Sequence, residues 1–131
     1  MRDESKPVLD TQGSARLYFR CFVAQHKGAG EILCVAHVDR SRYCLHLAAY
    51  GGGETSAPLP IRLIIADVLQ HESAGILLAH NHPSGDPQPS DSDCRLTRRL
   101  ATVAEALDCL VIDHLIFAGD RCVSFRSLGL L

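Results

Sequence analysis

The feature that most constrains the fold is a short apolar run, Gly75 to Ala79, that ends in three polar residues, His80-Asn81-His82. A short apolar run bounded by polar segments is typical of a strand that is buried on both faces of a sheet. Such a strand needs helices on both sides, because each face must be covered by apolar side chains. We therefore predict a central strand with two imidazoles at its carboxyl end.

The segments around this strand alternate between helical and extended patterns. Helices are predicted where apolar residues recur every three or four positions, and strands where short apolar runs stand between turns. The predicted helices are 14–25 (capped by Ser14, and also acceptable as a strand), about 61–71, and 90 to about 107. The predicted strands are 32–38, 43–50, 110–117 and 121–125, with the first and last pairs as hairpins. This pattern favours an α/β fold with a mixed sheet covered by helices.

Length and composition fit one domain. The chain has 131 residues, of which 47% are hydrophobic, enough to form a core. We expect residues 1–13 to be a loose polar lead-in and residues 14–131 to form the domain. In the helix that starts near Ser90, the apolar stripe is expected at Leu96, Leu100, Val103, Ala104 and Leu107.

Charge and cysteine usage argue against several classes of protein. With 13 basic and 15 acidic residues, the net charge of −2 gives no support for a nucleic-acid-binding face. The six cysteines form no C-x-x-C pair and stand mostly in apolar runs, so we expect reduced, buried thiols. The polar start does not resemble a signal peptide, and no apolar run reaches the about 20 residues of a membrane span. A cytoplasmic protein without membrane contact is expected.

Two histidines and one acid are candidate metal ligands. His80 and His82 are two positions apart, so they point the same way on an extended chain. The loop 83–89, with three prolines and one glycine, can bring the next helix back to the strand end. Asp93 in the first turn of that helix can complete a set of three ligands. Three protein ligands leave a fourth tetrahedral position for water, which is the pattern of catalytic zinc.

Each of these residues also has an ordinary structural explanation. An H-x-H pair alone is a weak signal, and Ser90 with Asp93 makes a capping box that satisfies free backbone donors of a helix. The combination favours the metal site, because no structural requirement calls for a buried strand ending in two histidines, a rigid loop and an acid together.

Other polar residues are expected to support the structure. Asn81 points away from the ligand face and should fix its loop, Asp86 fits a turn acid better than a partner of the site, and His114 fits a hydrogen-bonded core histidine. The remaining histidines are expected to be ordinary and a group of arginines to form a solvated helix face: His26, His37, His46, His71, Arg95, Arg98 and Arg99.

The string His80-Asn81-His82-Pro83-Ser84-Gly85-Asp86-Pro87-x-Pro89-Ser90-x-x-Asp93 resembles the JAMM/MPN metalloprotease motif, in the form found in the RadC-like branch. The resemblance covers about residues 28–131, and the pair Asp113-His114 is one of its features downstream of the motif. It implies a three-layer, helix-sheet-helix JAB/MPN-like domain, related to the cytidine-deaminase fold. It also implies that Zn²⁺ is held by His80, His82 and Asp93, and that Ser90 supports the oxyanion.

The resemblance further implies a general base near the start of the first hairpin strand. Glu31 stands directly before the run 32–35, and its implied role is to take a proton from a zinc-bound water and pass it to the leaving amine. The rival acids fit less well, because Glu54 lies in a glycine-rich turn and Glu72 lies past a helix end. Without the resemblance, Glu31 reads as a solvated acid at a strand end.

The resemblance thus implies a zinc-dependent hydrolase that cleaves a peptide or isopeptide bond of an unidentified peptide or protein substrate. One alternative is a RadC-like module associated with DNA repair or nucleic-acid processing. Many such proteins have an amino-terminal helix-hairpin-helix region, for which residues 1–27 are too few. The other alternative is a non-catalytic MPN interaction domain, against which the complete motif counts. Oligomerisation stays open.

Overall fold

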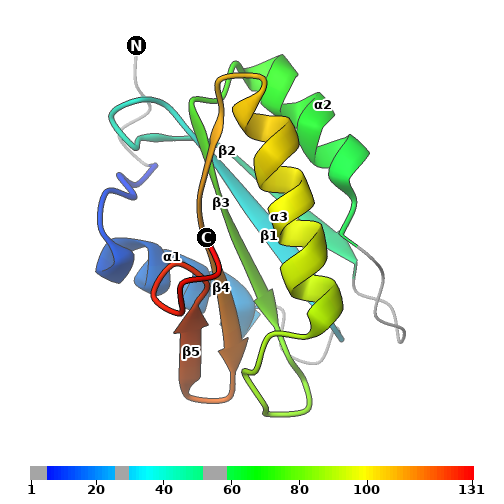
Figure 1. The fold of residues 1–131 in the computed structure, drawn as a ribbon. Coiled ribbons are helices and arrows are strands. Elements are labelled where there is room, and N and C mark those ends of the chain that lie inside the picture. Colours follow the sequence, from blue (N-terminus) through cyan, green and yellow to red (C-terminus); the bar gives the residue numbers. More distant parts are fainter. Residues whose placement is uncertain (1–5, 26–29, 52–58) are drawn as a thin grey trace.

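The computed structural model describes residues 6–25, 30–51 and 59–131, which form a mixed five-stranded sheet between helices (Figure 1). The elements in chain order are α1 (Gln12–Gln25), β1 (Ile32–Val38), β2 (Cys44–Gly51), α2 (Ile61–His71), β3 (Gly75–Asn81), α3 (Asp91–Glu105), β4 (Leu110–Ala118) and β5 (Arg121–Ser124). The strand order is β2-β1-β3-β4-β5, and only β3 and β4 are parallel. The predicted α/β fold with a central strand and two hairpins is confirmed.

The central strand β3 is buried on both faces up to its last residue. Leu77 and Ala79 pack in the core that α1 covers, whereas Ile76 and Leu78 pack in the core under α2 and α3. Figure 1 shows this three-layer arrangement, with α1 on one side of the sheet and the other two helices on the opposite side. Because side chains alternate along a strand, His80 joins the α3 face with Ile76 and Leu78.

The first helix begins earlier than predicted. Thr11, and not Ser14, is the capping residue, because Thr11 Oγ1 accepts from the Ser14 N–H at 2.9 Å. Ser14 Oγ in turn accepts from the Thr11 N–H at 3.1 Å, so the two residues make a capping box with serine in the place of the usual Glu or Gln. Ala15 and Phe19, one turn apart, are buried against the sheet, which explains why a helix forms here.

The described part of the lead-in is bound to the sheet. The Leu9 N–H donates to the Arg42 carbonyl at 2.8 Å, and the Cys44 N–H donates to the Pro7 carbonyl at 3.0 Å. Leu9 is only 2% exposed. Residues 7–9 are therefore not loose, because they pair beside the start of the edge strand β2 and cover part of its open edge.

Helix α3 buries two residues of the predicted stripe, Leu100 and Ala104, and one polar residue outside it. Its buried residues are Thr97, Leu100 and Ala104, whereas Val103 and Leu107 are exposed. The polar residue Thr97 is tolerated in this buried stripe because its hydroxyl hydrogen-bonds to the ring nitrogen Nδ1 of His114 on β4, at 2.8 Å. Apolar periodicity cannot locate such a residue, since its burial depends on a partner in another element.

All six cysteines are free thiols, and Cys34, Cys44 and Cys109 are buried while Cys21 is exposed. Burial raises the pKa of Cys34 to about 12 and that of Cys109 to about 11, so both thiols stay protonated. Among the described residues, none of the helices combines the length and apolar character that crossing a bilayer requires.

Three histidines that were expected to be ordinary lie together near the end of α2. His37 is fully buried, with Nδ1 2.8 Å from Ser73 Oγ, and no described residue is a hydrogen-bond partner for its Nε2. The rings of His46 and His71 stack at 4.2 Å, and each lies 5.8 Å from the His37 ring. Burial lowers the pKa of His37 to about 4, against the opposing influence of Asp67 and with the help of the two neighbouring histidines.

The lowered pKa of His37 predicts that acid weakens the fold. Between the ordinary value of 6.5 and about 4, the unfolded chain binds a proton at His37 that the folded chain does not, so stability falls as the pH falls. At about 1.4 kcal/mol for each pKa unit, the loss attributable to His37 is up to about 3 kcal/mol. We expect His37→Asn to flatten the free energy of unfolding, measured in urea, across this pH window.

The matched control is Ser73→Ala, which removes the hydrogen bond but keeps the imidazole. It should lower stability at every pH and keep most of the wild-type slope. Equal slopes in the wild type and His37→Asn would show that the acid sensitivity comes from other groups.

Candidate metal centre

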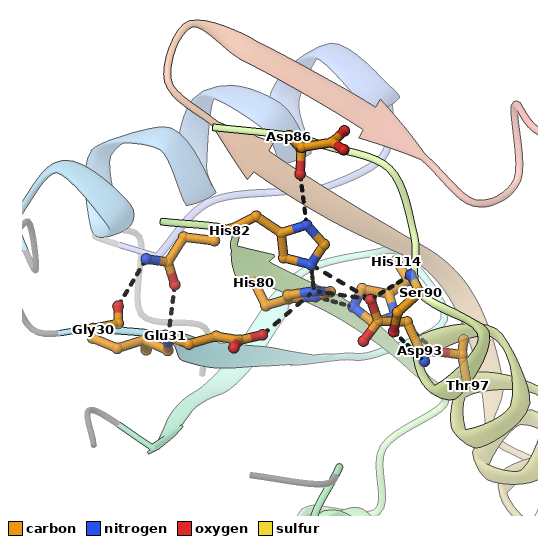
Figure 2. A network of polar contacts seen from close by, with 11 residues as sticks. Gly30, Glu31, His80, His82, Asp86, Ser90, Asp93, Thr97 and His114 are labelled. Atoms are coloured by element: carbon orange, nitrogen blue, oxygen red, sulfur yellow. Dashed lines mark hydrogen bonds and ion pairs between the residues drawn. The ribbon is translucent and has the colours of Figure 1, made fainter. Parts of the chain in front are cut away.

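Four side chains with metal-binding or acid-base chemistry meet at the carboxyl end of β3 (Figure 2). His80 belongs to this strand and His82 follows it, while Asp93 lies in the first turn of α3 and Glu31 directly precedes β1. Antiparallel pairing of β1 with β3 sets Leu33 opposite His80, so the start of β1 reaches the end of β3. The structure thus brings together the residues that the sequence singled out.

The spacing of the ligand atoms fits a tetrahedral metal site. His80 Nε2 and His82 Nε2 are 2.8 Å apart, and Asp93 Oδ2 lies 3.7 Å from the first and 3.4 Å from the second. With zinc–ligand bonds of about 2.0–2.1 Å, tetrahedral ligand atoms are about 3.3 Å apart, which these distances bracket. Glu31 also forms a triplet with the two histidines, with ligand atoms within 4.8 Å of one another. The donor types alone therefore allow either carboxylate as third ligand.

Asp93 is at the same time part of the helix cap. Its Oδ2 accepts from the Ser90 N–H at 3.0 Å, and Ser90 Oγ accepts from the Asp93 N–H at 2.9 Å. The capping box thus fixes the carboxylate in the orientation that faces the histidines. Burial opposes ionisation of Asp93, but the close approach of His80 and His82 to its carboxylate holds its pKa well below its usual range. The Asp93 carboxylate in turn raises the pKa of His82.

The backbone of Asp86 determines which nitrogen of His82 faces the site. Its carbonyl oxygen lies 2.8 Å from His82 Nδ1, and a carbonyl can only accept, so Nδ1 carries a hydrogen. A neutral His82 then has its lone pair on Nε2, the nitrogen that faces His80. The Asp86 carboxylate accepts from the Gln88 N–H at 3.0 Å, as expected of a turn acid.

The other nitrogen of His80 faces the buried His114. His80 Nδ1 lies 2.6 Å from His114 Nε2, and His114 Nδ1 lies 2.8 Å from Thr97 Oγ1. Burial lowers the pKa of His114 well below its ordinary value, so this imidazole is neutral. His114 is indeed a hydrogen-bonded core histidine. The sequence did not indicate that its partner is a candidate ligand, nor that Thr97 belongs to the site.

The ring of His114 packs against Phe125, which lies in the turn that follows β5. It stacks on Phe125 with ring centroids 4.5 Å apart. Asp113 Oδ1 accepts from the backbone N–H groups of His114 and Arg126, at 2.7 and 3.1 Å, and its Oδ2 accepts from Ser124 Oγ at 2.6 Å. This carboxylate therefore ties β4 to the turn that carries Phe125.

Asn81 fixes the backbone on both sides of Glu31. Its Oδ1 accepts from the Ile32 N–H at 2.7 Å, and its Nδ2 donates to the Gly30 carbonyl at 2.8 Å. The prediction that this amide fixes its own loop is wrong, because its partners lie at the start of β1. Gly51 allows a close approach here, because a Cβ at this position would lie 2.8 Å from the Glu31 carbonyl oxygen and its φ is +99°.

The remaining candidates lie elsewhere. Glu72 caps the carboxyl end of α2, before β3 begins, and so lies away from the end of β3 that carries the histidines. Glu54 and His26 fall outside the described residues. The arginines predicted to form a solvated face are exposed on α3: Arg95, Arg98 and Arg99.

A mixed sheet between helical layers, with an H-x-H pair at the end of its central strand and an acid in the next helix, defines a JAB/MPN-like domain. The sequence profile of the RadC-like JAB domain matches residues 10–130. The chain therefore belongs to the RadC-like JAB domain family.

Similar proteins carry the name UPF0758. One from Bordetella petrii is 44% identical over 128 residues, which cover 95% of this chain and 55% of that protein. One from Stenotrophomonas maltophilia strain R551-3 is 36% identical over 111 residues, 82% of this chain and 47% of that protein. One from Vibrio cholerae is 34% identical over 115 residues, 87% of this chain and 71% of that protein. The chain thus spans about half the length of the first two of these curated relatives.

The Asn81 contacts predict a specific loss of order around Glu31. Asn81→Ala removes both hydrogen bonds, so the Ile32 amide should exchange with solvent deuterium about five-fold faster, equivalent to about 1 kcal/mol for one hydrogen bond. The His82 N–H donates to the Phe117 carbonyl at 2.8 Å and should keep its rate. An unchanged rate at Ile32 would mean that Asn81 does not anchor this segment.

Proposed function

We propose that this domain is a zinc-dependent hydrolase that cleaves a peptide or isopeptide bond, with His80, His82 and Asp93 as protein ligands. The observation that carries the proposal is the convergence of two ring nitrogens and one carboxylate oxygen at separations of 2.8 to 3.7 Å. Imidazole nitrogen and carboxylate oxygen are donors that zinc accepts, and three of them leave one position for solvent, as in catalytic sites.

The two carboxylates are assigned different roles by their distances. Asp93 Oδ2 lies within 3.7 Å of both Nε2 atoms and is oriented by the Ser90 N–H, which suits a ligand that must hold its position. Glu31 Oε1 lies 4.0 Å from His80 Nε2, and its side chain is 29% exposed. With its backbone anchored and its carboxylate reaching solvent, Glu31 suits a group that moves a proton.

When bound, a zinc ion would lower the pKa of a water at the open position to about 7 and polarise the substrate carbonyl. Glu31 would accept the proton of the attacking water and later donate it to the leaving amine, so its protonation state is restored. The Ser90 hydroxyl accepts in the cap, so its own hydrogen can be donated to the oxygen that gains negative charge. The hydrogen bonds to His114 and Asp86 would keep both imidazoles oriented.

A nucleic-acid-processing module remains the second candidate, because Arg95, Arg98 and Arg99 are exposed together on α3. The net charge of −2 argues against it. DNA binding at physiological salt that is lost on replacing Arg98 and Arg99 would favour it over the hydrolase.

Metal analysis tests the proposed ligands. The protein should bind about one zinc ion for each chain, and His82→Ala and Asp93→Asn should both lose it. Asparagine can still accept from the Ser90 N–H, so Asp93→Asn should keep the helix cap and the fold. The matched control, Ser90→Ala, should lose about 1 kcal/mol of stability with the cap but keep the metal. Stoichiometric zinc in His82→Ala or Asp93→Asn would contradict the ligand set.

Cleavage tests the proposed base. In a screen of peptide and isopeptide substrates, the zinc-loaded wild type should be active and Glu31→Gln should keep its zinc while losing activity by about 10²- to 10⁴-fold. Cleavage that persists in Glu31→Gln would remove Glu31 from the mechanism. A zinc-loaded wild type that cleaves none of the substrates would favour the non-catalytic interaction domain.

A further inference from the structure

We propose that Thr97 and His114 are positioning residues that select the tautomer of His80, and that metal binding reverses the direction of the hydrogen bonds joining these three residues. The inference rests on the proposed metal site. It concerns two residues with no assigned role. Neither is a candidate ligand, because His114 contacts the nitrogen of His80 that faces away from the site and Thr97 contacts the far nitrogen of His114.

The five groups involved form a continuous chain of hydrogen bonds from α3 to the loop after β3 (Figure 2). Thr97 Oγ1 lies 2.8 Å from His114 Nδ1, and His114 Nε2 lies 2.6 Å from His80 Nδ1. His80 Nε2 then lies 2.8 Å from His82 Nε2, and His82 Nδ1 lies 2.8 Å from the Asp86 carbonyl oxygen. A neutral imidazole has one donor and one acceptor, so the direction of one link determines the next.

One direction of this chain prevents His80 from binding a metal. The Asp86 carbonyl requires the hydrogen of His82 on Nδ1, so a neutral His82 offers a lone pair at Nε2. The link between the two Nε2 atoms then needs a hydrogen on His80 Nε2. His80 Nδ1 must accept from His114, whose other nitrogen accepts from the Thr97 hydroxyl. In this direction, the nitrogen of His80 that faces the site has no free lone pair.

A metal ligand at His80 requires the opposite direction. A lone pair at Nε2 places the hydrogen on Nδ1, so His114 Nε2 must accept and His114 Nδ1 must donate to Thr97 Oγ1. The reversal moves each hydrogen one link along the chain. One proton leaves His80 Nε2 for solvent, His114 Nε2 passes its proton to His80 Nδ1, and Thr97 Oγ1 passes its proton to His114 Nδ1. The hydroxyl regains one proton from solvent, so each imidazole carries a single hydrogen in both states. A hydroxyl and an imidazole allow this reversal because each can donate or accept, whereas a carboxylate can only accept when ionised.

Burial makes a missing partner costly in either direction. Thr97 and His114 are each 1% exposed, so an unpaired ring N–H would not find water. The stacking on Phe125 and the Asp113 contacts hold the His114 ring in place. The pair therefore supports the ligating tautomer of His80 by supplying its acceptor, as outer partners of metal-bound histidines do.

Nitrogen NMR of the imidazoles tests the reversal directly, because protonated and unprotonated ring nitrogens differ in chemical shift. The spectra are recorded at about pH 9, well above the ordinary imidazole pKa. We expect the hydrogen of His114 on Nε2 in chelator-treated protein and on Nδ1 in zinc-loaded protein. A purely structural His114 would not change tautomer when zinc binds. The same protonated nitrogen in both samples overturns the proposal.

Zinc affinity in matched variants tests the positioning role. Thr97→Val keeps the shape but removes the hydroxyl, and His114→Phe keeps a ring that can stack on Phe125 but removes the acceptor. Each should weaken zinc binding by about 10- to 100-fold. Thr97→Ser keeps the hydroxyl and should bind within about three-fold of the wild type. Thermal unfolding of the chelator-treated variants checks their folding separately from the zinc-dependent rise in Tm.

The outcomes separate this inference from the proposed site. Wild-type protein that binds neither zinc nor cobalt overturns both. Wild-type protein that binds zinc overturns only the role of the pair if Thr97→Val and Thr97→Ser bind it with equal affinity, or if the tautomer of His114 does not change.

Discussion

Because β3 is paired on both sides and buried on both faces, its side chains must alternate between the two cores, and this alternation organises the site. His80 and His82 face α3, which carries Asp93 in its first turn. Asn81 between them faces the other layer and anchors the backbone around Glu31. A slip of one residue in the register of β3 would exchange these faces and turn both histidines away from Asp93.

The cap of α3 shows that a structural and a functional explanation of one residue need not compete. Asp93 accepts from the Ser90 N–H and faces both histidines with the same oxygen. An acid in the first turn is also favoured by the partial positive charge of a helix amino terminus. The cap thus restricts the carboxylate before any metal arrives, which reduces the entropy that metal binding would otherwise cost.

The sequence predicted what depends on local pattern. The bounds of α2 follow from its apolar spacing between Pro60 and a turn, and the spacing and the resemblance together indicated the candidate ligands. What it missed depends on pairing between distant segments. Thr97 was not among the predicted buried residues of α3, because its burial depends on His114, which lies on β4. The role of Asn81 likewise requires β1 beside β3, a pairing that no local pattern fixes.

The neutral His114 also has an electrostatic rationale. Asp93 and Glu31 together supply two carboxylates beside a site proposed for a divalent cation, so their charges suffice to balance it. A buried carboxylate in place of His114 would accept from His80, but it would add a third negative charge where the side chain is only 1% exposed. An outer carboxylate would also raise the basicity of His80, and a more basic ligand would lower the effective positive charge of the metal ion. A neutral imidazole supplies the acceptor without either effect.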